Sequence, residues 1–219
     1  MCTRYSLTVN KEQVAAQFGL SLDFALKASY NISACDQAYV ITNEQPRKLE
    51  AMIWGLIPQT SKDGANNGKL INARIEGINS SSSFRIPIRK KRCLVLADSY
   101  YDWKKEGLKR WPFRIVNADQ SLMVIAGVWE EREKGGNTIR SFSIITKPAV
   151  AAAAKVSHRM PLILKSSALQ DLWLDEVNLD DVFQIVKEAE VGELKCYPIS
   201  PKVDIIGYSS KELHEELAS

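Results

Sequence analysis

The sequence predicts an α+β protein whose core is a mostly antiparallel, β-barrel-like sheet with helices at its periphery. Short apolar segments separated by turn-like stretches fill the middle of the chain, a pattern typical of strands joined by short connections. The last third instead carries polar caps followed by apolar residues at helical spacing. No internal repeat or long linker divides the 219 residues, so we expect a single domain spanning 1–219.

The N-terminal part predicts one helix, two strands and a loop. Asn10 is a suitable N-cap for a short amphipathic helix, and Gly19 is a suitable stop for it. The segments QAYVITNEQ and LEAMIWGLIP are rich in apolar and β-branched residues and predict strands. The stretch PQTSKDGANNGK is dense in turn-forming residues and predicts a loop.

Four apolar segments predict further strands, namely RCLVLADSYYDW, WPFRIV, SLMVIAGVWE and SFSIITKPA. The segments SSALQDLWL, NLDDVFQIVKEAE and SSKELHEELA predict helices. The aromatic and thiol side chains in such apolar patterns are expected in the core. They are Trp103, Trp111, Trp129, Trp173, Cys35, Cys93 and Cys196.

The composition limits the class of protein. Hydrophobic residues make up 45% and charged residues 25%, as in ordinary globular proteins. No apolar run approaches the roughly 20 residues of a membrane span, and no signal peptide is apparent, so we expect a cytoplasmic protein without membrane contact. Four scattered cysteines and two histidines favour neither a disulfide framework nor a metal site. We therefore expect no metal or organic cofactor, and a monomer because no coiled-coil seam is present.

A basic run, FRIPIRKKR, spans Phe84 to Arg92 and places five cationic residues in nine, although the net charge of the chain is only +3. Two interpretations are open on the sequence alone. The run is either a solvated loop or edge strand, or it contacts a polyanion.

The second residue, Cys2, carries the most distinctive chemistry. Removal of Met1 leaves an α-amine, with an ordinary pKa of about 7.7–8.0, beside a thiol of about 8.5. The amine can form a Schiff base with an aldehyde, and the thiol can then close on the imine carbon to give a five-membered thiazolidine. The ring-opened sugar of an abasic site in DNA is such an aldehyde. Alternatively, Cys2 is merely a small residue that is compatible with removal of Met1.

Seven motifs occur in order along the chain: MCTRY, WGLIP, NARIE, RCLVLADSYYDW, AGVWE, FSIIT and RMPLIL. Together they make the sequence similar to the SOS-response-associated peptidase family, whose members process abasic sites and crosslink to single-stranded DNA. The resemblance covers most of the chain. It implies a β-barrel-like fold with peripheral helices, in agreement with the pattern above.

The resemblance implies four catalytic residues. Cys2 forms the crosslink, and Asn72 of the NAR motif orients the sugar or the Cys2 backbone. Asp102 stands where the family has a glutamate for proton transfer, so this carboxylate is one methylene shorter and has to lie closer or act through water. The family histidine before RMP aligns with Ser157, and His158 comes one residue later. Either the preceding loop lets His158 reach the site, or the histidine role is missing and His158 is a surface residue.

The resemblance also implies DNA contacts. Arg74, Arg85 and Arg159 are candidate phosphate ligands, and Trp54 is a candidate surface for base stacking. Each has a structural alternative, because arginines commonly bridge loops or carboxylates and a tryptophan between apolar neighbours is commonly buried.

Three functions are therefore open. The first is a sensor and shield that crosslinks to abasic sites in single-stranded DNA through Cys2. The second is a module that binds single-stranded or damaged DNA without a covalent bond. The third is a cysteine peptidase limited to its own N-terminus, for which the sequence shows no assembled Cys–His–Asn triad.

Overall fold

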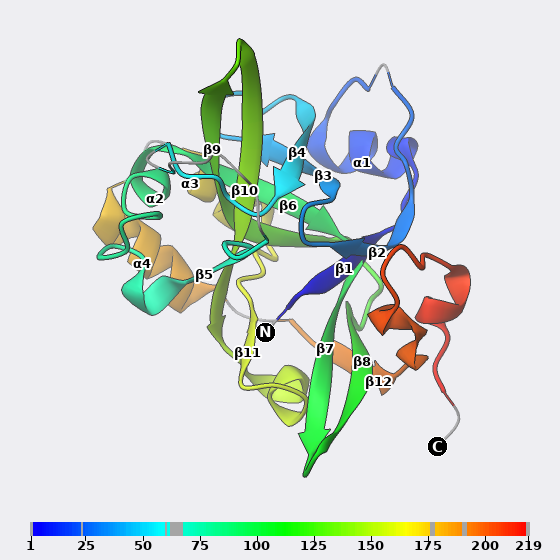
Figure 1. Cartoon of the computed structure of the whole chain (residues 1–219). Helices are drawn as coiled ribbons and strands as arrows, with labels where there is room; N and C mark the ends of the chain where they lie inside the picture. The colour runs from blue at the N-terminus through cyan, green and yellow to red at the C-terminus, as the bar shows by residue number, and fades with distance from the viewer. Residues whose placement is uncertain are drawn as a thin grey trace.

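A computed structural model describes residues 2–22, 24–59, 61, 68–175, 178–189 and 192–217. Within these residues the strands form two sheets (Figure 1). The predicted loop PQTSKDGANNGK falls for the most part outside the described residues. No helix in the described part of the chain is long and apolar enough to cross a membrane.

The larger sheet contains a closed barrel. Its strands are β11 (Arg159–Pro161), β10 (Asn137–Pro148), β4 (Leu49–Trp54), β3 (Gln37–Thr42), β6 (Arg92–Ala97) and β9 (Met123–Lys134), with β5 (Asn72–Arg74) paired to β10. Strands β10, β4, β3, β6 and β9 close the barrel because β9 also pairs with β10. All pairings in it are antiparallel except those of β10 with β4 and β5. The α+β prediction with a mostly antiparallel, barrel-like core is confirmed.

The second sheet has the order β12 (Leu194–Pro198), β8 (Lys109–Asn117), β7 (Ser99–Glu106), β1 (Arg4–Leu7) and β2 (Ser29–Ser33). It packs against the barrel, since Tyr5 and Tyr100 belong to the same buried cluster as barrel residues such as Trp129 and Phe142. The N-terminus of the chain therefore lies where the two sheets meet (Figure 1).

The helices lie around this core. They are α1 (Lys11–Phe18), α2 (Pro87–Lys90), α3 (Ser167–Leu174) and α4 (Leu179–Glu188), with short 3-10 turns η1 (Ile75–Gly77), η2 (Ala151–Lys155), η3 (Pro201–Asp204) and η4 (Lys211–His214). Asn10 caps α1 and Gly19 ends it in the left-handed conformation, as predicted. Helix α3 is anchored to the barrel because the indole N–H of Trp173 donates to the carbonyl groups of Cys93 and Gly127.

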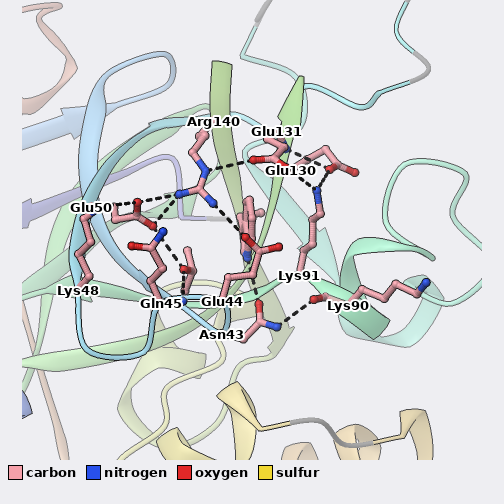
Figure 2. Close-up of polar contacts among 12 residues, drawn as sticks. Asn43, Glu44, Gln45, Lys48, Glu50, Lys90, Lys91, Glu130, Glu131 and Arg140 are labelled. Atoms are coloured by element: carbon pink, nitrogen blue, oxygen red, sulfur yellow. Dashed lines mark hydrogen bonds and ion pairs between the residues drawn. The ribbon is translucent and has the colours of Figure 1, made fainter. Parts of the chain in front are cut away.

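A network of charged side chains covers one side of the barrel (Figure 2). Arg140 on β10 donates to Glu50 on β4 at 2.7 Å and to Glu44 at 3.3 Å, and its guanidinium lies 4.3 Å from the ring centre of Trp129. Lys91 pairs with Glu130 at 2.7 Å. Because these contacts join neighbouring strands and the β3–β4 turn, the network holds the barrel wall together.

Five expectations from the sequence about burial or secondary structure are wrong. Cys196 is only partly buried. Trp111 is 50% exposed, since it lies on the outer part of a hairpin, and Trp103 is only partly buried. Cys35 is exposed because it occupies a left-handed turn with φ of 72°. The segment SSKELHEELA forms only the short η4, since it lies flat on the second sheet with Leu213 as its buried anchor.

The C-terminal segment contains a half-buried histidine, His214. The His214 ring meets Tyr30 edge-on at 4.8 Å between ring centres, and its Nε2 lies 3.1 Å from Ser6 Oγ. Burial and the neighbouring Arg114 lower the pKa of His214 from 6.5 to about 4, although Asp98 opposes the change. His214 is therefore neutral at pH 7.

We expect His214 to make the free energy of unfolding depend on pH in the acidic range. Because the folded pKa is lower than the unfolded one, the unfolded state binds the proton first as pH falls. The free energy of unfolding should decrease from about pH 6.5 down to about pH 4. Chemical denaturation at several pH values should show this decrease in the wild type and a flatter profile in His214→Gln. Parallel profiles for the two proteins would contradict the assignment.

Candidate active site

Cys2 lies immediately before β1 and is fully buried, with 0% of its surface exposed. Its thiol donates to the carbonyl oxygen of Arg4, with an Sγ···O distance of 3.5 Å. Burial, and secondly the negative charge of Asp102, raise the pKa of the Cys2 thiol well above its usual value. The thiol is therefore protonated at neutral pH and requires a base before it can act as a nucleophile.

Asn72 ties the barrel to the N-terminus. It is the first residue of β5, and its Nδ2 donates to the carbonyl oxygen of Cys2 at 2.5 Å. The register of β5 along β10 places Asn72 opposite Ile144. Since β10 is a long barrel strand, it gives β5 a rigid support. The hydrogen bond thus fixes the Cys2 backbone at the junction of the two sheets.

Asp102 belongs to the second sheet. It lies on β7, which pairs with β1, and only 4% of its surface is exposed. Its Oδ1 accepts a hydrogen bond from the backbone N–H of Trp103 at 2.9 Å. Its charge acts on the Cys2 thiol, so the carboxylate and the thiol belong to one buried cluster.

Two tyrosines complete this cluster, and the sequence analysis did not single them out. Tyr5 and Tyr100 are opposite one another on β1 and β7. Burial, and next the neighbouring Cys2, raise the pKa of both phenols. Within the described residues, both hydroxyl groups and the Oδ1 atom of Asn72 are buried without a hydrogen-bond partner. Buried polar atoms without a partner are rare and costly, and they suit a site that binds a polar group.

The strand that carries Asn72 also leads to the surface. Side chains two residues apart on a strand share a face, so Arg74 lies on the face of Asn72 while Ala73 points into the core. Arg74 is exposed, as is Arg85. Both positions are therefore accessible to a phosphate, and their contact with DNA stays a prediction.

Arg159 is bound within the protein. Its guanidinium donates to both carboxylate oxygens of Glu76 at 2.9 and 3.0 Å, and to the carbonyl oxygen of Thr146 at 2.7 Å. The hydrogen bond to Arg159 lowers the pKa of Glu76. The pair joins the NARIE segment to β11. Arg159 thus has the structural role that the sequence left open as the alternative to a phosphate contact. A phosphate contact by Arg159 stays a prediction.

Two of the five cations in the basic run Phe84 to Arg92, Lys91 and Arg92, are also bound within the protein. Arg92 is buried, and its guanidinium donates to the carbonyl oxygens of Trp173, at 2.7 Å, and of Asp175 at the end of α3. A cation at a helix C-terminus is stabilised by the exposed carbonyl groups there. Lys91 pairs with Glu130. Arg89 and Lys90 are exposed and, with Arg85, are the accessible cations of this run.

The structure corrects the stacking expectation for Trp54. Its indole is fully buried, packs edge-on against Tyr5 at 4.9 Å between ring centres, and donates from Nε1 to the carbonyl oxygen of Ile71. No face of the ring is open to a base. Trp54 instead supports Tyr5 beside Cys2.

His158 is exposed, whereas Ser157 is half-buried. The described contacts of the Cys2 thiol do not include a histidine. His158 precedes β11, whose residues Arg159 to Pro161 are all buried. The geometry therefore favours the interpretation in which His158 is a surface residue. No group of three or more metal-binding side chains is found in the part of the chain that the structure describes.

Comparisons with known proteins agree with this arrangement. A family model described as "SOS response associated peptidase (SRAP)" matches residues 1–206. The chain belongs to the SRAP family. The match includes Cys2, Asn72, Asp102 and all the motifs from which the resemblance was recognised.

Relatives within the SRAP family have descriptive names. The chain is 31% identical to "Abasic site processing protein YoqW" of Bacillus subtilis, over 98% of this chain and 99% of that protein. It is 30% identical to "Abasic site processing protein HMCES" of Gallus gallus, over 76% of this chain and 56% of that protein. A crystal structure of a protein from Bacteroides thetaiotaomicron, 27% identical, superposes with a TM-score of 0.82 over 92% of this chain and 93% of that one.

Proposed function

We propose that this protein recognises abasic sites in single-stranded DNA and forms a covalent thiazolidine with their aldehyde through Cys2, after Met1 has been removed. The observation that carries the proposal is the anchoring of the Cys2 backbone by Asn72 beside a buried carboxylate. The names of the relatives support the class of substrate.

The chemistry needs the two groups of an N-terminal cysteine and a proton carrier. The α-amine adds to the C1′ aldehyde, and loss of one water gives an imine. The thiol then adds across the C=N bond, so that sulfur bonds to carbon and the thiol proton ends on nitrogen. Asp102 carries protons for both steps, accepting one from the amine or thiol and returning one to the departing water or to nitrogen.

The surroundings of Cys2 favour a small polar substrate. The thiol is fully buried, and the hydroxyl groups of Tyr5 and Tyr100 and the Oδ1 atom of Asn72 have no partners among the described residues. A sugar without its base is small enough to approach such a site and has hydroxyl groups to bind these atoms. A nucleotide with an intact base is larger and has no free aldehyde, so it is not a substrate.

Intact-mass spectrometry tests the proposal directly. The purified protein is measured alone and after incubation with a single-stranded oligonucleotide containing one abasic site, quenched in denaturant. We expect a protein that lacks Met1, and an adduct whose mass is the sum of protein and DNA minus one water. An oligonucleotide with tetrahydrofuran in place of the abasic sugar has no aldehyde and should give no adduct.

Two outcomes would contradict the proposal. A protein without Met1 that binds the oligonucleotide and forms no adduct would favour the non-covalent binding module. Turnover of a generic peptide that depends on Cys2 would favour a peptidase, which the contact of the thiol with the Arg4 carbonyl group does not support.

A further inference from the structure

The hairpin formed by β7 and β8 has two different faces. Directly opposed residues of an antiparallel pair share a face. One face carries Tyr101 and Arg114 and is covered by other parts of the chain. Tyr101 donates to the carbonyl oxygen of Tyr30 at 2.8 Å, and Arg114 donates to the hydroxyl of Tyr197 at 2.6 Å. The hairpin extends away from the barrel (Figure 1).

The other face begins at the candidate active site. Its cross-strand pairs are Tyr100 with Ile115, Asp102 with Phe113 and Lys104 with Trp111, in order from the core to the tip. Exposure rises along it: Ile115 is 1% exposed, Phe113 is half-buried and Trp111 is 50% exposed. Trp111 thus lies one pair further out than Asp102, about 7 Å along the strand.

Two lysines lie beside this exposed indole on the same face of the hairpin, Lys104 and Lys109. Lys104 is opposite Trp111, and its side chain is 43% exposed although it pairs with Glu106 at 2.7 Å. Lys109 is exposed and shares the face of Trp111, two residues away on β8, whereas Arg110 lies on the other face and pairs with Asp204. Surface ion pairs such as that of Lys104 are weak and exchange readily with a phosphate. A flat aromatic face among cations is the combination that binds single-stranded nucleic acid.

We propose that Trp111 stacks on the base of a nucleotide next to the abasic site and so positions the lesion at Cys2. The inference rests on the proposed function, because the DNA strand has to pass from Asp102 along the same face of the hairpin. Trp111 takes the place for which the sequence suggested Trp54. An abasic nucleotide has no base that the protein can bind. Stacking of the neighbouring base on Trp111 therefore sets the position of the lesion relative to Cys2.

Binding measurements with a non-reactive substrate separate this inference from the covalent chemistry. A single-stranded oligonucleotide with tetrahydrofuran at the lesion binds but cannot crosslink, and its affinity is measured by fluorescence anisotropy. Trp111→Ala should weaken binding about 5- to 150-fold, the range for loss of one stacked base. Trp111→Phe should recover most of the affinity. The salt dependence should be unchanged because no phosphate contact is removed.

A second set of oligonucleotides identifies the stacked base. A second tetrahydrofuran replaces, in turn, each nucleotide flanking the lesion. We expect one of these to weaken binding by the wild type about as much as Trp111→Ala does, and to have no further effect on Trp111→Ala. Additive losses at every position would overturn the inference.

Leu108→Ala is the matched control, since Leu108 is a fully exposed apolar side chain at the tip of the same hairpin. It should bind like the wild type. Thermal melting of each variant checks that the fold is intact. Unchanged affinity of Trp111→Ala would overturn the inference. A change in the oligomeric state of Trp111→Ala without a loss of affinity would also overturn it. A wild type that shows the Trp111-dependent binding but forms no crosslink with a true abasic site would overturn only the covalent function.

Discussion

Cys2→Ser should convert the stable crosslink into one that only a reductant can trap. The variant keeps an α-amine at residue 2 after removal of Met1, so an imine still forms. Because the serine hydroxyl is a far weaker nucleophile than a thiol, ring closure to a durable product is lost. On denaturing gels the variant should give no adduct after heating, and a clear adduct when cyanoborohydride is added before the quench.

The control for this experiment is Cys35→Ser. Cys35 is exposed and chemically accessible, whereas Cys2 is buried. Cys35→Ser should crosslink like the wild type, which excludes adventitious capture of the aldehyde by a surface thiol. A heat-stable adduct of Cys2→Ser at the wild-type level would show that the durable bond involves another residue.

Asp102→Asn should slow crosslinking about 100- to 10,000-fold, the usual range for loss of a general acid–base. The amide keeps an oxygen that can accept the hydrogen bond from the Trp103 backbone, so the strand geometry is retained. The measurement is the single-turnover rate of adduct formation with saturating protein. Binding of the tetrahydrofuran oligonucleotide should be unchanged.

Whether Asp102→Asn slows or speeds crosslinking separates two roles of the carboxylate, namely proton transfer and the electrostatic effect of its charge on the Cys2 thiol. The charge of Asp102 raises the pKa of the Cys2 thiol, after burial as the first cause. If that charge were its main influence, removing it would ease formation of the thiolate and speed the reaction. A faster Asp102→Asn would therefore contradict proton transfer. Asp102→Glu, which keeps the carboxylate and restores the family's residue, should retain most of the rate.

Local sequence patterns were sufficient for much of the fold. The capping by Asn10 and Gly19, the strands β3 and β4 and the helices α3 and α4 follow from residues that are near neighbours in the chain. Such elements depend on capping and on apolar periodicity, which a single segment contains. The failure of SSKELHEELA shows the limit of this reasoning. Its periodicity is helical, but contacts of Leu213 and His214 with distant strands determine its conformation.

Exposure was the property that local patterns predicted least well. Trp54 and Trp111 both lie in strand-like segments, and the sequence analysis placed Trp111 in the core although charged residues directly precede it. Trp54 is buried because its strand, β4, is part of the barrel. Trp111 is exposed because it lies on the β7–β8 hairpin, which extends beyond the barrel. The tertiary structure thus reversed the exposure that the sequence suggested for these two residues, with Trp54 buried and Trp111 exposed.

The sequence by itself determined which reactive groups are candidates for the proposed chemistry, and the tertiary structure decided how they are placed. A cysteine at residue 2, a carboxylate in YYDW and the amide of NAR are properties of residue type and position, so they can be recognised before any fold is known. Only the junction of the two sheets brings the amide of Asn72 to the Cys2 carbonyl group, 70 residues away in the chain. The same junction buries the thiol beside Asp102, and the pairing of β5 and β11 with β10 brings Arg159 to Glu76. Burial and long-range pairing depend on how strands assemble, which no local pattern contains.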